Sequence, residues 1–149
     1  MPFLIPSLVA PALKTPAPAP NGPTEIVRAL FSDHFKHDMG FTKESVARKA
    51  RWLTPDFLAK LNAELSRPGN PDEVPNIDGD PFTDSQEYPK RFSAGKAEIV
   101  GELTRIPVLF TGNGRRRTIG VELRKTSDGW RVDNLVYEDG KTLRSRLGK

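Results

Sequence analysis

The hydrophobic pattern of this chain changes period near the middle, which constrains the fold more than any other feature. In the first half, apolar residues recur at the three- and four-residue spacing of a helix face; in the second half they alternate, as in strands with one buried side. Thr54, Pro55 and Asp56 are typical of a helix start: an N-cap, a first-turn proline and an acid that suits the helix dipole. Helices are predicted in residues 24–40, 42–53 and 54–65.

Strand and turn signals fill the second half. Asn113-Gly114 predicts a tight hairpin turn, because both central residues of such a turn take positive φ, and Asp128-Gly129 predicts a second turn. The alternation breaks after Val132, which predicts a β-bulge near Asp133-Asn134. Helices followed by an antiparallel sheet of about four strands define the α+β class, with the N-terminal helices packed on one face. The strands are expected in residues 96–103, 104–111, 117–125 and 130–137, before a short helical turn at 142–147.

Residues 1–23 are predicted to lie outside the fold, which leaves 24–149 as a single α+β domain. The first charge is Lys14, and the apolar run before it resembles the hydrophobic region of a secretory signal followed by a Pro/Ala-rich spacer. A start codon upstream of Met1 would explain why no basic residue precedes this run. We therefore expect a periplasmic or secreted protein; the alternative is a cytoplasmic protein with a disordered tail.

Composition excludes several classes of site. The chain has no cysteine, so it forms no disulfide, no thiolate zinc site and no lipoprotein anchor. The apolar N-terminal run is too short for a transmembrane span. His34 and His37 are the only histidines, and His34 shares the apolar face of its predicted helix, which favours a buried, hydrogen-bonded histidine over a metal ligand. Neither a metal nor a cofactor is predicted.

Two stretches resemble a known family: "DGDPFTDSQEYP", with its Asp80-Pro81-Phe82 loop, and the last strand, "GWRVDNLVY". Over residues 24–147 the chain resembles the bacterial family called domain of unknown function 3828, within the nuclear-transport-factor-two-like superfamily. The resemblance implies a curved sheet wrapped by helices, an export signal in many members and no established catalytic activity. It supplies no catalytic residues.

The acidic loop is predicted to be structural. Counted from Asp78, an EF-hand would need glutamate at the twelfth position, which is Pro89, so that pattern fails. We expect Phe82 to insert as a hydrophobic anchor, with Asp80 or Asp84 bonding backbone amides or an arginine of the sheet. An irregular calcium site made by the three aspartates is the alternative.

Basic residues gather in the second half, where residues 89–149 hold fourteen bases and seven acids. Nucleic-acid readers interleave such bases with exposed aromatic residues, whereas the aromatics here, Tyr88 and Tyr137 apart, are expected in the core. An acidic protein surface or the anionic envelope is therefore favoured over nucleic acid. The predicted contact surface is the open sheet face with the hairpin rim, or else the 78–88 loop. Its basic residues are Arg115, Arg116, Arg117, Arg124 and Arg131.

Two hypotheses for function follow. The favoured one is a non-enzymatic exported domain that binds another macromolecule, as an envelope accessory or immunity-type protein, and is a monomer or homodimer. The other is a small-molecule-binding or lyase/isomerase-type pocket inside the sheet, with Asp133 and Tyr137 as its polar groups. Catalysis is not the favoured hypothesis, because a fold alone does not imply an activity.

Overall fold

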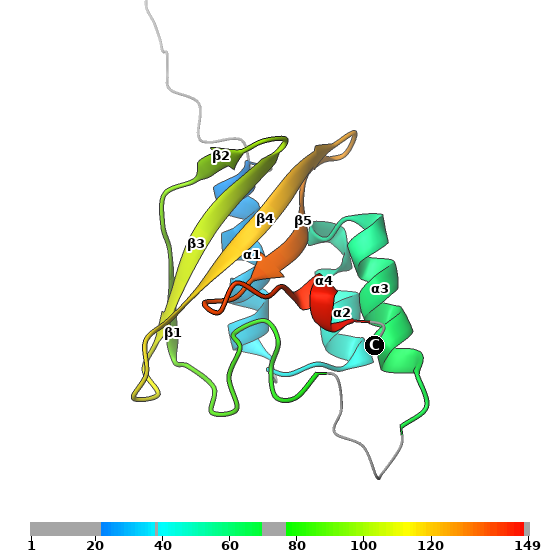
Figure 1. Cartoon of the computed structure of the whole chain (residues 1–149), viewed down its shortest axis with the longest axis vertical. Helices are drawn as coiled ribbons and strands as arrows, with labels where there is room; N and C mark the ends of the chain where they lie inside the picture. Colours follow the sequence, from blue (N-terminus) through cyan, green and yellow to red (C-terminus); the bar gives the residue numbers. More distant parts are fainter. Residues whose placement is uncertain (1–21, 38, 70–76, 148–149) are drawn as a thin grey trace, which may run out of the picture.

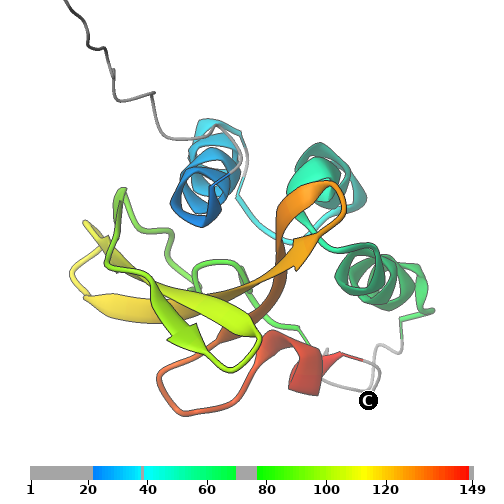
Figure 2. The same cartoon turned by 90° about the horizontal axis from the view of Figure 1, so that it is seen from above.

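The computed structural model describes residues 22–37, 39–69 and 77–147. Three helices lie on one face of an antiparallel sheet, and a fourth, short helix follows the last strand (Figure 1, Figure 2). This confirms the α+β class and the packing of the N-terminal helices on the sheet. The predicted Pro/Ala-rich segment lies outside the described residues, apart from its last two. None of the described helices combines the length and apolar character needed to cross a membrane.

The helices begin where the sequence signals them. The side chain of Thr42 accepts a hydrogen bond from the backbone N–H of Ser45, and Thr54 caps the next helix by accepting from the N–H of Phe57. The Thr54 cap followed by Pro55 confirms the predicted helix start. The helices are α1 (Pro23–Lys36), α2 (Lys43–Lys49), which continues as the 3₁₀ turn η2 (Ala50–Trp52), α3 (Pro55–Ser66) and α4 (Leu143–Arg146).

The sheet has five strands where the sequence predicted about four. The extra strand arises because β1 and β2 pair in succession with the same edge of β3. Between them, the N–H of Gly95 donates to the carbonyl of Pro107, which has no N–H to return, so the ladder breaks there. The order is β1-β3-β4-β5, with the strands β1 (Arg91–Ala94), β2 (Glu98–Val100), β3 (Leu103–Thr111), β4 (Arg117–Thr126) and β5 (Gly129–Val136).

One predicted irregularity is confirmed and one predicted turn is wrong. Glu122 pairs with Asn134 and Leu123 with Val132, so Asp133 is the extra residue of a bulge. The β3–β4 connection is a five-residue loop (112–116), not a tight two-residue turn. Positive φ occurs at its two glycines and not at Asn113, whose side chain bonds the neighbouring loop instead.

The core lies between the helices and the inner face of the sheet. Along β3 every second residue is buried, and the rings of Phe31 from α1 and Phe110 from β3 meet at 5.1 Å between centroids. The opposite face of β3 stays half-exposed, and there Arg105 pairs with Glu122 of β4 at 2.6 Å. Burial on one face only is what the alternating sequence predicts.

Candidate protein-interaction site

The described loop before β1, residues 77–90, is held from inside the protein by Asp80. Its carboxylate is fully buried and accepts hydrogen bonds from His34 Nε2 at 2.7 Å, Thr83 Oγ1 at 2.6 Å and the backbone N–H of Phe82 at 3.0 Å. His34 is also fully buried, as the sequence predicted, but its Nδ1 has no hydrogen-bond partner among the described residues. Three donors on one buried carboxylate hold residues 80–83 in place.

Phe82 and Tyr137 anchor the same loop. Phe82 is 1% exposed and packs between the His34 ring, 5.1 Å away, and the Lys49 ammonium, 5.0 Å from its ring centre. The hydroxyl of Tyr137 donates to the carbonyl of Pro81 at 2.8 Å. Phe82 and the carboxylates therefore have the placement that the sequence favoured for a structural loop.

Lys49 is a buried base beneath this loop. Its side chain is fully buried, and Nζ donates to the hydroxyl of Ser45 at 2.9 Å and lies 3.6 Å from Asp33. Burial lowers the pKa of Lys49 to about 8, against a smaller raising effect from the charge of Asp33. In the folded protein, the Lys49 ammonium group therefore loses its proton more readily than it does in the unfolded chain.

This pKa predicts that stability rises with pH above neutrality. Between pH 8 and 10.5 the unfolded chain binds the Lys49 proton more tightly than the folded protein, so raising the pH favours folding. From pH 7 to 9.5, the free energy of unfolding of the wild type should gain about 2 kcal/mol relative to Lys49→Met. Urea denaturation of both proteins at each pH measures this difference. A constant difference would contradict a lowered pKa.

Asp84 joins the loop to two other elements. Its carboxylate lies 3.0 Å from Arg117 of β4 and 3.4 Å from Arg146 of α4, and its carbonyl also accepts from Arg117. Asp84 is the one described non-glycine residue with a positive φ, of 53°. Aspartate tolerates this conformation better than most residues, and the two arginines keep it there.

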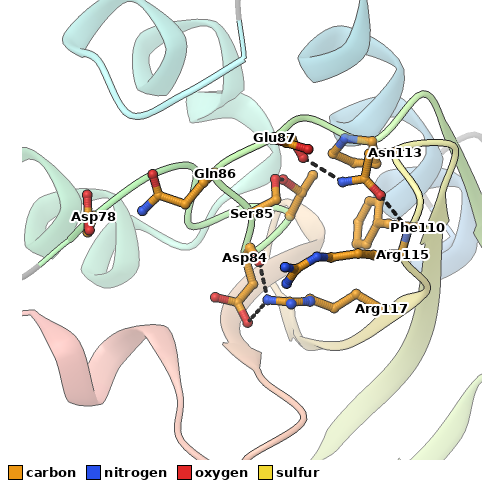
Figure 3. Close-up of a pocket in the computed structure, with 11 residues that line it drawn as sticks. Asp78, Asp84, Ser85, Gln86, Glu87, Phe110, Asn113, Arg115 and Arg117 are labelled. Carbon is orange, nitrogen blue, oxygen red and sulfur yellow. Dashed lines mark hydrogen bonds and ion pairs between the residues drawn. The ribbon is translucent and has the colours of Figure 1, made fainter.

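A groove of about 300 Å³ lies between this loop and the β3–β4 hairpin. Asn113 bridges the two walls, because its side-chain amide donates to the carbonyl of Glu87 and its Oδ1 accepts from the N–H of Arg115 (Figure 3). Arg117 lies across the floor toward Asp84. The loop wall includes Asp78, Thr83, Asp84, Ser85, Gln86, Glu87 and Pro89, and the hairpin side includes Phe110, Asn113, Arg115 and Arg117.

The groove unites two surfaces that the sequence left as alternatives, the 78–88 loop and the hairpin arginines. Arg115 and Arg116 are exposed and form no ion pair with any described residue. Glu87 and Tyr88 are exposed on the facing loop, with Tyr88 at 48%. We call Glu87, Tyr88, Asn113, Arg115 and Arg116 the rim: Glu87, Asn113 and Arg115 line the groove, and Tyr88 and Arg116 are the exposed residues that follow Glu87 and Arg115 in the chain.

The predicted arginines do not form one continuous patch. Arg117 forms an ion pair with Asp84. Arg124 and Arg131 lie opposite each other on β4 and β5, toward the other end of the sheet. Arg124 binds Asp133 at 3.1 Å, and Arg131 donates to the carbonyl of Trp130. Of the five, only Arg115 is both exposed and part of the groove lining, and Arg116 is its exposed neighbour in the hairpin.

Asp133 and Tyr137 are occupied by contacts within the fold. Asp133 accepts hydrogen bonds from Thr54, Arg124 and Arg144, and it lies outside the groove. Tyr137 is 3% exposed, so the expectation that it is an exposed aromatic is wrong. Burial raises the pKa of its hydroxyl, against the charge of Arg146, whose guanidinium lies 4.0 Å from the ring centre.

Metal ligation finds no support among the residues that the structure describes. They include no group of three or more histidine, aspartate or glutamate side chains arranged to hold a metal ion. The three loop aspartates considered for calcium face different partners: Asp80 is buried against His34, Asp84 pairs with two arginines, and Asp78 is exposed.

Comparison with solved structures identifies this fold. The chain is similar to a chain in the crystal structure of the type VI native effector–immunity complex Tae3–Tai3 from Ralstonia pickettii, with a TM-score of 0.60 and 19% identity. The match covers 79% of this chain and 96% of the other, which is the immunity protein Tai3. The selenomethionine form of that complex matches with a TM-score of 0.60 and 18% identity, over 78% of this chain and 97% of the other.

Comparison of the sequence with known families and curated proteins finds no match. No protein-family model matches the chain, so the resemblance to domain of unknown function 3828 is not confirmed, and no curated protein matches either. The likeness to Tai3 therefore establishes an α+β immunity-protein-like fold.

Proposed function

We propose that this protein is an immunity-type protein that binds and neutralises a protein effector. The observation that carries the proposal is the fold likeness to Tai3, which spans 96% of a chain solved in complex with its effector. Nearly all of the Tai3 chain has a counterpart in this chain, so the likeness covers the fold of the immunity protein and not one part of it. Export to the periplasm, expected from the apolar N-terminal segment, fits a protein that meets its effector in the envelope.

The rim is the proposed contact surface. Tyrosine and arginine are the residue types that contribute most often to binding energy in protein interfaces, and the rim includes the exposed Tyr88 on the loop and the exposed Arg115 and Arg116 on the hairpin. Asp80, Phe82 and the Asp84–Arg117 pair fix the walls beneath them. Binding to a surface that is already ordered loses less conformational entropy, which favours tight association.

Charge reversal on the hairpin should therefore abolish tight binding. The double variant Arg115→Glu/Arg116→Glu should weaken affinity for the cognate effector at least about a hundredfold, because two contacts of a buried interface become repulsive. Biolayer interferometry against each type VI effector of the source bacterium, produced separately, first identifies the cognate effector and then measures this loss. No binding to any effector by the wild type would contradict the proposed function.

The matched control changes the same charge elsewhere. Lys43→Glu/Lys60→Glu alters two exposed lysines on α2 and α3, across the molecule from the hairpin (Figure 1). This variant should bind as the wild type does, and circular dichroism checks the folding of both. In cells that export the effector, the wild type and the control should restore growth and the rim variant should not. Equal loss in both variants would mean that net charge, and not the rim, governs binding.

A further inference from the structure

The two walls of the groove carry charges of opposite sign. On the hairpin side, Arg115 is exposed and forms no ion pair with any described residue. On the loop side, Asp78 and Glu87 are exposed, and neither forms an ion pair with a residue that the structure describes. Facing charges neutralise each other only when they pair, so the charges of both walls remain available to a partner.

The contacts that join the two walls leave these charges unused. Asn113 donates to the backbone carbonyl of Glu87, so the Glu87 carboxylate keeps no hydrogen bond to any described residue. Arg117 binds Asp84, and the side chain of Arg115 extends in the same direction, toward the loop wall (Figure 3). The groove is therefore held together by an amide and an ion pair that do not involve the Arg115 guanidinium or the Glu87 carboxylate.

The groove is small and partly apolar. Its volume of about 300 Å³ lies at the lower end of the range for ligand sites, so it accepts a few side chains of a partner and not a whole helix or strand. Phe110 and Pro89 are buried and belong to its lining. Long charged side chains suit such a space, because their aliphatic parts cover apolar surface while their charged ends reach polar groups.

We propose that the groove receives a short segment of the effector that carries one acidic and one basic side chain. The acidic group binds Arg115, and the basic group binds Glu87 on the facing wall. The aliphatic parts of both side chains lie against Phe110 and Pro89. This inference rests on the proposed function, because the segment belongs to the effector, and it adds the chemistry by which that effector is recognised.

A groove with both signs of charge selects among partners. A uniformly acidic surface gains affinity at Arg115 but is repelled by Glu87, and a uniformly basic surface meets the reverse. Each wall therefore excludes partners that satisfy only the other wall. Residues 89–149 hold an excess of bases, which attracts acidic surfaces in general. Glu87 is the residue that discriminates against them.

Charge reversal of each wall tests the proposal. The probe is the type VI effector of the source bacterium that binds the wild type most tightly. Arg115→Glu and Glu87→Lys should each weaken binding at least about tenfold, because one contact becomes repulsive in each. The double variant should bind more weakly than either single variant. Biolayer interferometry measures the affinities, and all melting temperatures should match that of the wild type, because both side chains are exposed.

Two matched controls make the same changes of charge elsewhere. Lys60→Glu lies on α3, and Glu102→Lys lies in the β2–β3 turn, at the end of the sheet away from the β3–β4 hairpin (Figure 1). Both residues are exposed and outside the groove. Both variants should bind the effector as the wild type does. A loss in a control equal to that in the groove variant of the same charge change would show that net charge governs the affinity, against the proposal.

The sign of the Glu87→Lys effect separates the possible partners. Tighter binding by this variant, with the double variant returning toward wild-type affinity, would mean a uniformly acidic partner and would overturn the inference while the proposed function stands. Tighter binding by Arg115→Glu would mean a uniformly basic partner, with the same consequence. Wild-type affinity in both single variants would exclude the groove as the contact. A wild type that binds no effector would overturn the proposed function, and this inference with it.

Discussion

Replacing Asp80 with alanine is expected to lower the free energy of unfolding by about 3–5 kcal/mol, because three buried hydrogen bonds to one carboxylate are lost together. The carboxylate accepts from His34, Thr83 and the backbone of Phe82, all of them buried. Its removal would leave Nε2 of His34 without a partner on a ring whose Nδ1 already has none. Buried polar groups left without hydrogen bonds are a main source of large destabilisation.

Urea denaturation of three variants separates this effect from a general loss of charge. Asp78→Ala removes an exposed carboxylate two residues away and should change stability by less than about 0.5 kcal/mol. His34→Ala and the double variant His34→Ala/Asp80→Ala complete a double-mutant cycle. The double variant should be more stable than the sum of the two losses predicts, because the residues share one contact. A denaturation midpoint for Asp80→Ala equal to that of the wild type would contradict this role.

Loss of the Asp80 contacts should also weaken effector binding; this prediction rests on the proposed function. The loop that carries Glu87 and Tyr88 is ordered from beneath by Asp80 and Phe82, so releasing it adds an entropy cost to association. The rim side chains themselves remain unchanged in this variant. Affinity measured at a temperature where Asp80→Ala stays folded distinguishes this indirect effect from unfolding.

The order of elements was predictable because it depends on local signals. The change of period, the Thr54 cap and the break in alternation at Asp133 are each contained in a few neighbouring residues. Strand β1 was missed because its four residues, Arg91–Ala94, alternate too briefly to stand out from a loop. The β3–β4 turn was predicted too short, because the side chain of Asn113 bonds a loop that is distant in sequence.

The candidate site depended on contacts that no local pattern carries. The partners of the acidic loop come from α1, β4 and α4, with sequence separations of 46 for His34–Asp80 and 33 for Asp84–Arg117. The sequence therefore indicated that an arginine or a backbone amide would bind the carboxylates, but not which one. It also treated the loop and the hairpin as alternatives, whereas Asn113 joins them in one groove.

Asp133, considered from sequence as a polar group of a pocket, is instead expected to contribute to stability. Its bulge position directs the carboxylate to Thr54 Oγ1 at 2.7 Å, Arg144 at 2.8 Å and Arg124 at 3.1 Å. Because Thr54 caps α3 and Arg144 belongs to α4, one carboxylate connects two helices to β5. Asp133→Ala should lower the free energy of unfolding by about 2–4 kcal/mol, as for several charge-assisted hydrogen bonds lost together. Asp128→Ala, at the exposed β4–β5 turn, is the control and should lose less than about 0.5 kcal/mol.

The pH dependence of this loss identifies the charge as its cause. Burial pushes the pKa of Asp133 upward, but the Thr54 hydrogen bond and the charge and hydrogen bond of Arg144 outweigh it, so the pKa lies below the ordinary 3.8. A carboxylate with a lowered pKa in the folded state stabilises the protein above its unfolded pKa and loses that contribution as pH falls. The stability difference between the wild type and Asp133→Asn should therefore be constant from pH 7 to about 5 and shrink below pH 4. A difference that persists undiminished at pH 2 would show that Asp133 acts through shape and packing, and that its charge does not hold α3 and α4 to the sheet.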